Sequence, residues 1–107
     1  MHPELSIPVI WAEDGGSPLA GRLDVHADRL HLDGGSRSAR ETRDVPYASI
    51  ASARIGRTLG DRVNGRRAML IGLRAGGTIS IVGFDRPGTL AELLGQLQRR
   101  AGIAERA

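Results

Sequence analysis

Short runs of β-forming residues recur along this chain of 107 residues, and Gly, Asp, Asn or Ser follows most of them. Runs of this length with turn residues between them are typical of an antiparallel, mainly β domain. The pattern predicts seven strands, at about 5–12, in the two arms of 19–33, and at about 42–45, 50–57, 68–74 and 78–84. Asn64-Gly65, the strongest turn signal in the chain, joins the fifth strand to the sixth.

The hairpin at 19–33 alternates well enough to predict its register. A turn at Ala27-Asp28 places aliphatic pairs on one face and polar or oppositely charged pairs on the other. The pairs are Leu23 with Leu32, Val25 with Leu30, Arg22 with Asp33, and Asp24 with His31. Ala-Asp is not the Asn-Gly of a tight turn, and a longer turn with a bulge at Arg29 would shift this pairing.

Two features predict bends in the middle of the chain. Pro46 has no backbone N–H to donate, which suits the end of a strand, and 47–49 then forms a compact corner. The apolar residues after the corner, Ile50, Ala53 and Ile55, do not keep a strict period of two. We therefore expect a bulge near 51–53 in the fifth strand.

The last part of the chain has the spacing of an α-helix. Its apolar stripe consists of Leu90, Leu93, Leu94 and Leu97. Its end signals are a capping box at Thr89 and Glu92, basic residues at Arg99 and Arg100, and a glycine at Gly102. This helix, at about 87–101, needs an apolar surface to cover, and the open end of a bent sheet supplies one. We expect a single domain over 1–107, with its strands within about 5–84.

Composition excludes several classes of protein. The chain has no cysteine, which excludes a disulfide framework, a thiolate zinc site and a cysteine nucleophile. Its longest stretches without charge, at 5–12, 68–73 and 75–84, are far shorter than the ~18 apolar residues of a membrane span. The N-terminal residues include an acid and two prolines where a signal peptide needs basic and apolar residues. We expect a cytoplasmic protein, with peripheral attachment to a membrane as the alternative.

The positive charge of the chain is concentrated in its middle. All fifteen basic residues are arginine, a bias that coding preference explains more simply than guanidinium chemistry does. Residues 1–33 hold two arginines and six acids, residues 34–74 nine arginines and three acids, and residues 75–107 four arginines and three acids. This asymmetry indicates an acidic partner, although a solvated surface also accounts for it.

Several stretches carry a resemblance to a known family. GRLDVHADRLHLD, at 21–33, looks like a second and third strand, and DVPYASIASARI, at 44–55, looks like a proline-tyrosine corner before the next strand. LRAGGTISIVGF, at 73–84, followed by LAELLGQL, at 90–97, looks like a final hairpin and its capping helix. Over about 5–101 the chain thus resembles bacterial pleckstrin-homology (PH)-like domains. The resemblance implies a seven-stranded antiparallel bent sheet capped by a C-terminal α-helix, and a binding module rather than an enzyme.

The best-known members of that family hold phosphoinositide headgroups at the open end of the sheet opposite the helix, between the loops after strands one, three and six. Their pattern has a basic residue late in the first strand and a basic pair early in the second, and here only Arg22 matches it. Glu13 and Asp14 stand where a cation is expected, and Asp24 stands in place of the second base. Because carboxylates repel a phosphate group, this departure counts against tight phosphoinositide binding.

Two sets of arginines are candidate binding residues. The first set would grip an anion at the open end and consists of Arg22, Arg37, Arg40 and Arg43. The second set brackets the Asn64-Gly65 turn, would contact a protein, and consists of Arg54, Arg57, Arg62, Arg66 and Arg67. A solvated loop carries such residues more often than a site does. Few aromatic residues accompany the second set, so the stacking platforms of a single-stranded nucleic-acid site are missing and nucleic acid is not an expected partner.

His26, His31 and Asp24 are predicted to lie together on the outward face of the hairpin. Their side chains suit a metal site or a proton relay, but polar pairing on a solvent-facing sheet explains them better, and we expect no metal or other cofactor. No nucleophile motif is present, and the AGGT stretch at 75–78 lacks the lysine and the helix of a phosphate-binding loop.

The sequence therefore predicts a non-enzymatic module that acts through protein contact. In PH-like relatives that recognise peptides, an extended segment adds beside the strand that is at 50–57 here and lies against the C-terminal helix. Arg54 and Arg57 would contact an acidic peptide there, and a second copy of the chain is another candidate partner. The same residues are also explained if the strand at 50–57 is an ordinary sheet edge, whose charges prevent other strands from pairing with it. The alternative function is peripheral binding of anionic lipid through the first arginine set.

Overall fold

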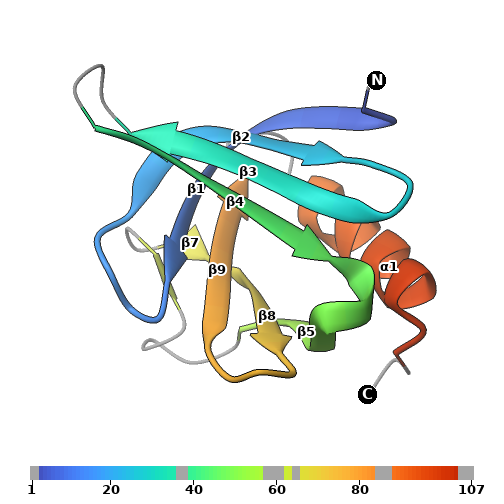
Figure 1. Ribbon diagram of the computed structural model, residues 1–107. Helices are drawn as coiled ribbons and strands as arrows, with labels where there is room; N and C mark the ends of the chain where they lie inside the picture. Colours follow the sequence, from blue (N-terminus) through green and yellow to red (C-terminus); the bar gives the residue numbers. More distant parts are fainter. Residues whose placement is uncertain (1–2, 36–38, 57–61, 64–65, 84–87, 104–107) are drawn as a thin grey trace.

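The computed structural model describes residues 3–35, 39–56, 62–63, 66–83 and 88–103 (Figure 1). Its main sheet consists of β1 (Leu5–Glu13), β2 (Leu19–Val25), β3 (Arg29–Gly35), β4 (Arg40–Pro46), β5 (Ile50–Ile55), β8 (Met69–Leu73) and β9 (Thr78–Gly83). The short 3-10 helix η1 (Tyr47–Ser49) joins β4 to β5, and α1 (Gly88–Ala101) follows the strands. A small second ladder consists of β6 (Arg62–Val63) and β7 (Arg66–Arg67).

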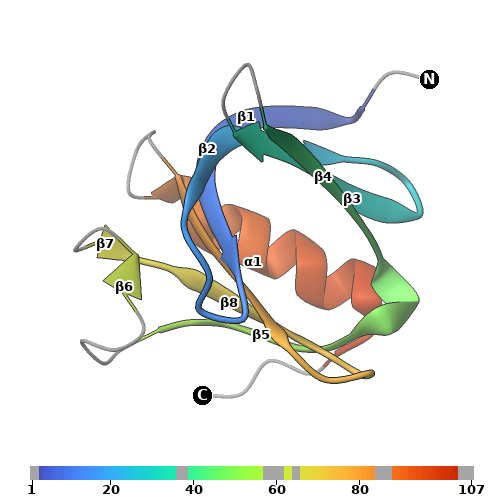
Figure 2. The same ribbon diagram turned by 60° about the vertical axis from the view of Figure 1, so that its left-hand side comes forward.

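Neighbouring strands of the main sheet are antiparallel and follow the order β4-β3-β2-β1-β9-β8-β5. The sheet curls into a half-barrel, and α1 lies across the opening between its two arms (Figure 2). The expected architecture, a bent sheet of seven antiparallel strands with a C-terminal helix, is confirmed. The two edges of this sheet are β4 and β5, which η1 joins directly along the chain.

The register predicted for the hairpin at 19–33 is confirmed. Leu23 lies opposite Leu32 and Val25 opposite Leu30, and all four side chains are fully buried. The opposite-charge pairs on the other face are also register partners. The turn closes through a hydrogen bond from the His26 N–H to the carbonyl of Arg29, 2.9 Å away, so no bulge shifts the pairing.

The core fills the space between the curled sheet and the helix. Leu93 and Leu97 of α1 are fully buried in it, whereas Leu90 and Leu94 are half-buried at its margin. The sheet contributes mostly aliphatic side chains, among them Val9, Leu23, Leu30, Leu32, Ile50, Met69, Ile71, Ile79 and Ile81. The four-leucine stripe thus faces the sheet, as its spacing predicted. The predicted capping box involves the side chain of Thr89, which lies outside the described ones.

Two glycines allow β2 and β3 to approach closely where the sheet bends. A Cβ atom on Gly21 would lie 1.8 Å from the carbonyl oxygen of Asp33, and a Cβ on Gly34 would lie 2.9 Å from Trp11 Nε1. The same Trp11 nitrogen donates a hydrogen bond to the Asp33 carbonyl at 2.9 Å. A side chain at Gly21 would require the backbone to move, and one at Gly34 would require the Trp11 side chain to shift.

The predicted corner and bulge are both present. Pro46 is the last residue of β4, and η1 turns the chain immediately after it. The register between β5 and β8 then shifts between Ile50 and Ser52, which makes Ala51 the extra residue of a bulge.

The region around Asn64-Gly65 differs from the prediction. The chain does not pass directly from the fifth strand of the sheet to the sixth, because β6 and β7 pair with each other as a separate ladder. β6 lies beside β1 and β9. A second, smaller apolar cluster is found on the outer face of that part of the sheet, where Ala68, Leu70 and Val82 are buried with Ile10 packed against them.

No helix in the described part of the chain is both long enough and apolar enough to cross a membrane.

Candidate functional site

The described members of the first arginine set are divided between the two faces of the sheet. Arg22 lies on the outer face of β2, where its Nε donates to Ser6 Oγ at 3.0 Å. Arg40 at the start of β4 forms an ion pair with Asp33, with 3.1 Å between Nη2 and Oδ1. Arg37 lies outside the described residues.

Arg43 faces the opposite way from Arg22. It is the register partner of the buried Leu32, so its side chain starts on the inner face of the sheet. Its Nε lies 3.2 Å from Glu13 Oε1. This is an ion-pair distance without hydrogen-bond geometry, since the buried Nε has no hydrogen-bond partner. The acid that sequence analysis places at the mouth of the sheet is therefore already paired with an arginine of the predicted grip.

The second arginine set is only partly described. Arg54 lies exposed on β5, and Arg66 and Arg67 lie exposed on β7. Arg57 lies outside the described residues, and for Arg62 only the backbone is described. The exposed members are thus divided between an edge strand of the main sheet and the small second ladder.

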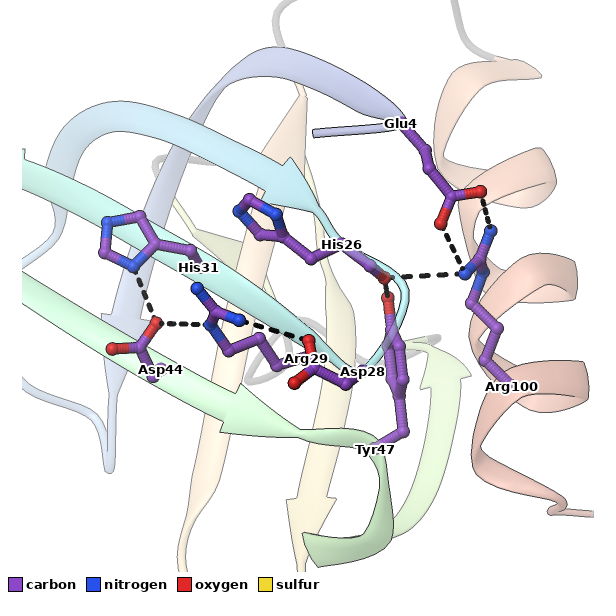
Figure 3. Close-up of polar contacts among 8 residues, drawn as sticks. All are labelled: Glu4, His26, Asp28, Arg29, His31, Asp44, Tyr47 and Arg100. Atoms are coloured by element: carbon purple, nitrogen blue, oxygen red, sulfur yellow. Dashed lines mark hydrogen bonds and ion pairs between the residues drawn. The ribbon is translucent and has the colours of Figure 1, made fainter. Parts of the chain in front are cut away.

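A polar cluster that sequence analysis did not predict ties the end of α1 to the start of β1 (Figure 3). Arg100 donates to both carboxylate oxygens of Glu4, at 2.9 and 3.0 Å, and its Nη1 also lies 3.4 Å from the backbone carbonyl of His26. Tyr47 donates its hydroxyl to the same carbonyl at 2.7 Å. The guanidinium lies 5.9 Å from the centre of the Tyr47 ring. Four separate segments of the chain therefore meet at one point.

The pKa values in this cluster follow from these contacts. The hydrogen bonds from Arg100 lower the pKa of Glu4, although some desolvation opposes them, and the same pair raises the pKa of Arg100. Burial of the Tyr47 phenol raises its pKa. At neutral pH the cluster thus holds a charged pair and a neutral phenol.

Beside this cluster is a shallow hollow. It is lined by Glu4, Leu5, Gln96, Arg99 and Arg100. Of its two arginines, Arg100 is held by Glu4 and Arg99 is exposed.

The position predicted for His26 is wrong. The side chain is buried, 8% exposed, and its Nδ1 has no hydrogen-bond partner in the described part of the chain. The physical reason is that β2 ends at Val25, so the alternation that would have turned the next side chain outward stops there. His26 therefore does not form a surface pair with His31.

His31 lies on the outer face opposite Asp24, as predicted, but its side chain is hydrogen-bonded to another residue. Its Nδ1 lies 2.7 Å from Asp44 Oδ1 on β4, and Arg29 Nε donates to the same oxygen at 3.2 Å (Figure 3). These contacts lower the pKa of Asp44, the hydrogen bond with His31 first. Asp24 instead accepts from Ser6 Oγ at 2.6 Å. No group of three metal-ligating side chains is found among the residues that the structure describes.

Some backbone N–H and C=O groups of the edge strand β5 point away from its neighbour in the sheet, β8. The N–H of Gly56 donates to the carbonyl of Ala68, 2.9 Å away. Bonded and unbonded pairs alternate along an antiparallel ladder, so the backbone of Arg54 also faces β8. The N–H and C=O groups of Ala53 and Ile55 then point outward, where another extended chain could pair with them.

The side chains along β5 leave this edge only partly accessible, because Ala53 as a whole is 8% exposed. Ala51, Ser52 and Arg54 are exposed, while the other three side chains point into the molecule and are buried or half-buried. On the helix side, Gln98 Nε2 reaches the outward carbonyl of Ala53 at 3.4 Å, a long hydrogen bond. This strip between β5 and α1 is the candidate functional site.

Comparison with known proteins supports the fold and gives no family. No protein-family model matches the chain, and no curated protein matches it. Among solved structures, the C-terminal domain of an unknown protein from Leishmania infantum is similar, with a TM-score of 0.66 and 16% sequence identity over 89% of this chain and 83% of that one. At this identity the likeness shows a shared arrangement of strands and helix alone.

Proposed function

We propose that this chain is a PH-like, non-enzymatic binding module that takes up an extended protein segment along β5, beside α1. The observation that carries the proposal is the outward-pointing backbone of Ala53 and Ile55, which follows from the ladder between β5 and β8. A strand added there gains main-chain hydrogen bonds, and the neighbouring helix gives its side chains a surface to contact. A second copy of the chain, pairing through its own β5, is one such segment. We place this binding in the cytoplasm.

The side chains of β5 support this choice of edge. Ala51 and Ser52 are small and exposed, so an approaching strand meets no bulky side chain there. Natural sheets commonly protect an edge with charge, proline or a bulge, and in β5 the charge is limited to Arg54. The bulge at Ala51 bends the strand near its start and leaves the ladder regular from Ser52 onward.

Anionic-lipid binding at the open end has less support. It needs the guanidinium groups of the first arginine set to be available to a phosphate group. Arg40 and Arg43 are held by Asp33 and Glu13, and Arg22 is bonded to Ser6. A headgroup would have to compete with carboxylates that are already in place.

The proposal is tested by selecting random dodecapeptides on the purified protein and repeating the binding with Ala51→Lys. A lysine at this exposed position disfavours the pairing of another strand with β5, because it places a charge on the edge, and it removes no core side chain. The matched control is Thr42→Lys on β4, also an exposed position on an edge strand. We expect selected peptides to bind the parent and Thr42→Lys equally and Ala51→Lys at least about tenfold more weakly.

Further experiments distinguish between the possible partners. Ala53→Pro removes the outward N–H directly and should also abolish binding, provided that circular dichroism shows a parental fold. Sedimentation of the parent and of Ala51→Lys tests whether the partner is a second copy. The proposal would be overturned if the protein is monomeric and no peptide is enriched. It would also be overturned if the selected peptides bind the β5 variants as tightly as the parent. Salt-sensitive binding to vesicles that contain phosphatidylserine, lost in Arg22→Ala with Arg40→Ala, would favour the lipid alternative.

A further inference from the structure

One hydrogen-bond acceptor on the β5 edge is already in use. Gln98, in the last turn of α1, donates from Nε2 to the outward carbonyl of Ala53 at 3.4 Å. A strand added to β5 would donate a backbone N–H to the same oxygen. This contact is part-buried, and Ala53 itself has little exposed surface. The side-chain amide of Gln98 thus takes the place of a main-chain donor of the incoming segment.

The backbone that carries Gln98 is held in place. The helix ends in a Schellman motif, in which the N–H of Ile103 donates to the carbonyl of Gln98 at 3.0 Å. Gly102 has the positive φ that this motif needs, 66°. The ion pair between Arg100 and the start of β1 holds the same turn. Because the backbone is fixed in these ways, Gln98 leaves Ala53 by rotating its side chain.

The contact itself is weak enough to be displaced. A distance of 3.4 Å is long for an N–H···O bond, whereas paired strands reach about 2.9 Å. Gln98 is half-buried, so its released amide can turn toward water. Within the described residues, α1 makes no such bond to Ile55, two positions further along β5. A segment can therefore begin to pair at Ile55 and then compete for the carbonyl of Ala53.

We propose that Gln98 is an autoinhibitory residue of the β5 site, whose amide has to release the carbonyl of Ala53 before a segment pairs along the whole edge. This inference rests on the proposed function, since it needs a segment that pairs with β5. The segment must bring an N–H to replace the amide, so a proline at that position of the segment is disfavoured. In the absence of a partner, Gln98 protects the edge from unspecific pairing.

The test measures, by fluorescence anisotropy, how tightly selected dodecapeptides bind Gln98→Met and Gln98→Glu. Peptides are selected on the parent and, separately, on Gln98→Met. Both replacements are close to glutamine in size and neither offers a side-chain donor. One is apolar and the other is charged, so an effect common to both comes from the loss of the donor. We expect both variants to bind at least about threefold more tightly than the parent, because no hydrogen bond has to be broken first.

The matched controls are Gln96→Met and Gln96→Glu. Gln96 is half-buried on the same helix, two residues earlier. These changes should alter the affinity less than about 1.5-fold, because Gln96 makes no contact with the carbonyl of Ala53.

Two further measurements separate release of the edge from a change of structure. Adding Ala51→Lys to Gln98→Met should cancel the gain in affinity, because the lysine disfavours pairing at the same edge. In NMR spectra of the parent, the side-chain amide signals of Gln98 should shift when a peptide binds, and those of Gln96 should not. A side chain that only stabilises the helix end would show neither effect.

The possible results distinguish this inference from the proposed function. If Ala51→Lys abolishes binding but the Gln98 variants bind no more tightly than the parent, the inference is wrong and the proposed function stands. The inference is also wrong if the gain in affinity persists with Ala51→Lys present. Both are wrong if no peptide is enriched on the parent or on Gln98→Met and both proteins are monomeric. If peptides are enriched only on Gln98→Met and Ala51→Lys abolishes their binding, the inference is supported most directly.

Discussion

The two edge strands of the sheet are stabilised in different ways. β4 carries charged side chains along most of its length and ends in Pro46, and its contacts are mainly exposed ion pairs, such as those of Arg40 and Asp44. β5 has small or aliphatic side chains and a single charge, it lies beside α1, and its first residue, Ile50, is fully buried. One edge therefore depends on solvent-exposed electrostatics and the other on burial.

The backbone shows the same contrast. The N–H of Tyr47 donates to the carbonyl of Asp28, so by alternation the backbone of Asp44 and Pro46 points outward from β4. Pro46 has no N–H to offer, and Asp44 brings a charge to an approaching strand. On β5 the outward groups belong to Ala53 and Ile55, which have neither feature. A protein can thus close one edge of a sheet and leave the other available for binding.

The largest expected effect tests the burial on the β5 side. Leu97→Ala should lower the free energy of unfolding by about 2–5 kcal/mol, because a fully buried side chain between the helix and the sheet is replaced by a cavity. Leu94→Ala, at a half-buried position of the same helix, should cost clearly less. Urea denaturation measures both values. Equal losses would mean that the helix packs differently from the arrangement described.

A smaller effect is expected where η1 leads into β5. Tyr47→Phe removes the hydroxyl that donates to the His26 carbonyl and keeps the ring in the core. It should lower the free energy of unfolding by about 0.5–1.5 kcal/mol, the usual contribution of such a hydrogen bond. Thermal melts of the two proteins check this. A variant as stable as the parent would show that Arg100 satisfies the carbonyl without help.

The ion pairs predict how stability changes with pH. The folded pKa of Glu4 is below its ordinary value of 4.5 because Arg100 holds the carboxylate, so the unfolded chain binds the proton more readily. The stabilisation is present above that ordinary value and is lost as the pH falls through the lowered folded pKa. Asp44 behaves in the same way below 3.8. Melting temperatures measured from about pH 6 to about pH 3 should fall less steeply in Glu4→Gln than in the parent. The same slope in both proteins would contradict this reading.

The smallest effect is expected on the β4 side. Arg40→Ala removes an exposed arginine paired with Asp33 and should change the free energy of unfolding by at most about 0.5 kcal/mol. Urea denaturation at low and high salt measures it. A loss comparable with that of Leu97→Ala would remove the distinction between the two edges.

Much of the fold could be predicted because it rests on local periodicity. The leucine spacing at 90–97 and the alternation at 19–33 each predict one face of one element, and the structure confirms both. The bulge near Ala51 was predictable as well, since apolar residues break the period of two there. Each of these features depends on residues close together in the sequence.

The polar contacts were harder to predict because they depend on how segments meet. Nothing in the local sequence shows that Glu4 lies beside Arg100 or that both reach the carbonyl of His26. Arg43 was assigned to an anion-binding set at the open end of the sheet, but its register pairing with Leu32 places it on the inner face, where it is paired with Glu13. The separate β6–β7 ladder was missed because Asn64-Gly65 was taken as the turn of one long hairpin.

The Glu4–Arg100 pair also bears on the rate of unfolding. Its two residues are 96 positions apart in the chain, so the contact forms only after almost the whole chain has been brought together. Interactions of this kind are commonly absent from the transition state for folding, and such interactions slow unfolding without speeding folding. Arg100, at the end of α1, would then slow the detachment of β1 from the rest of the molecule during unfolding.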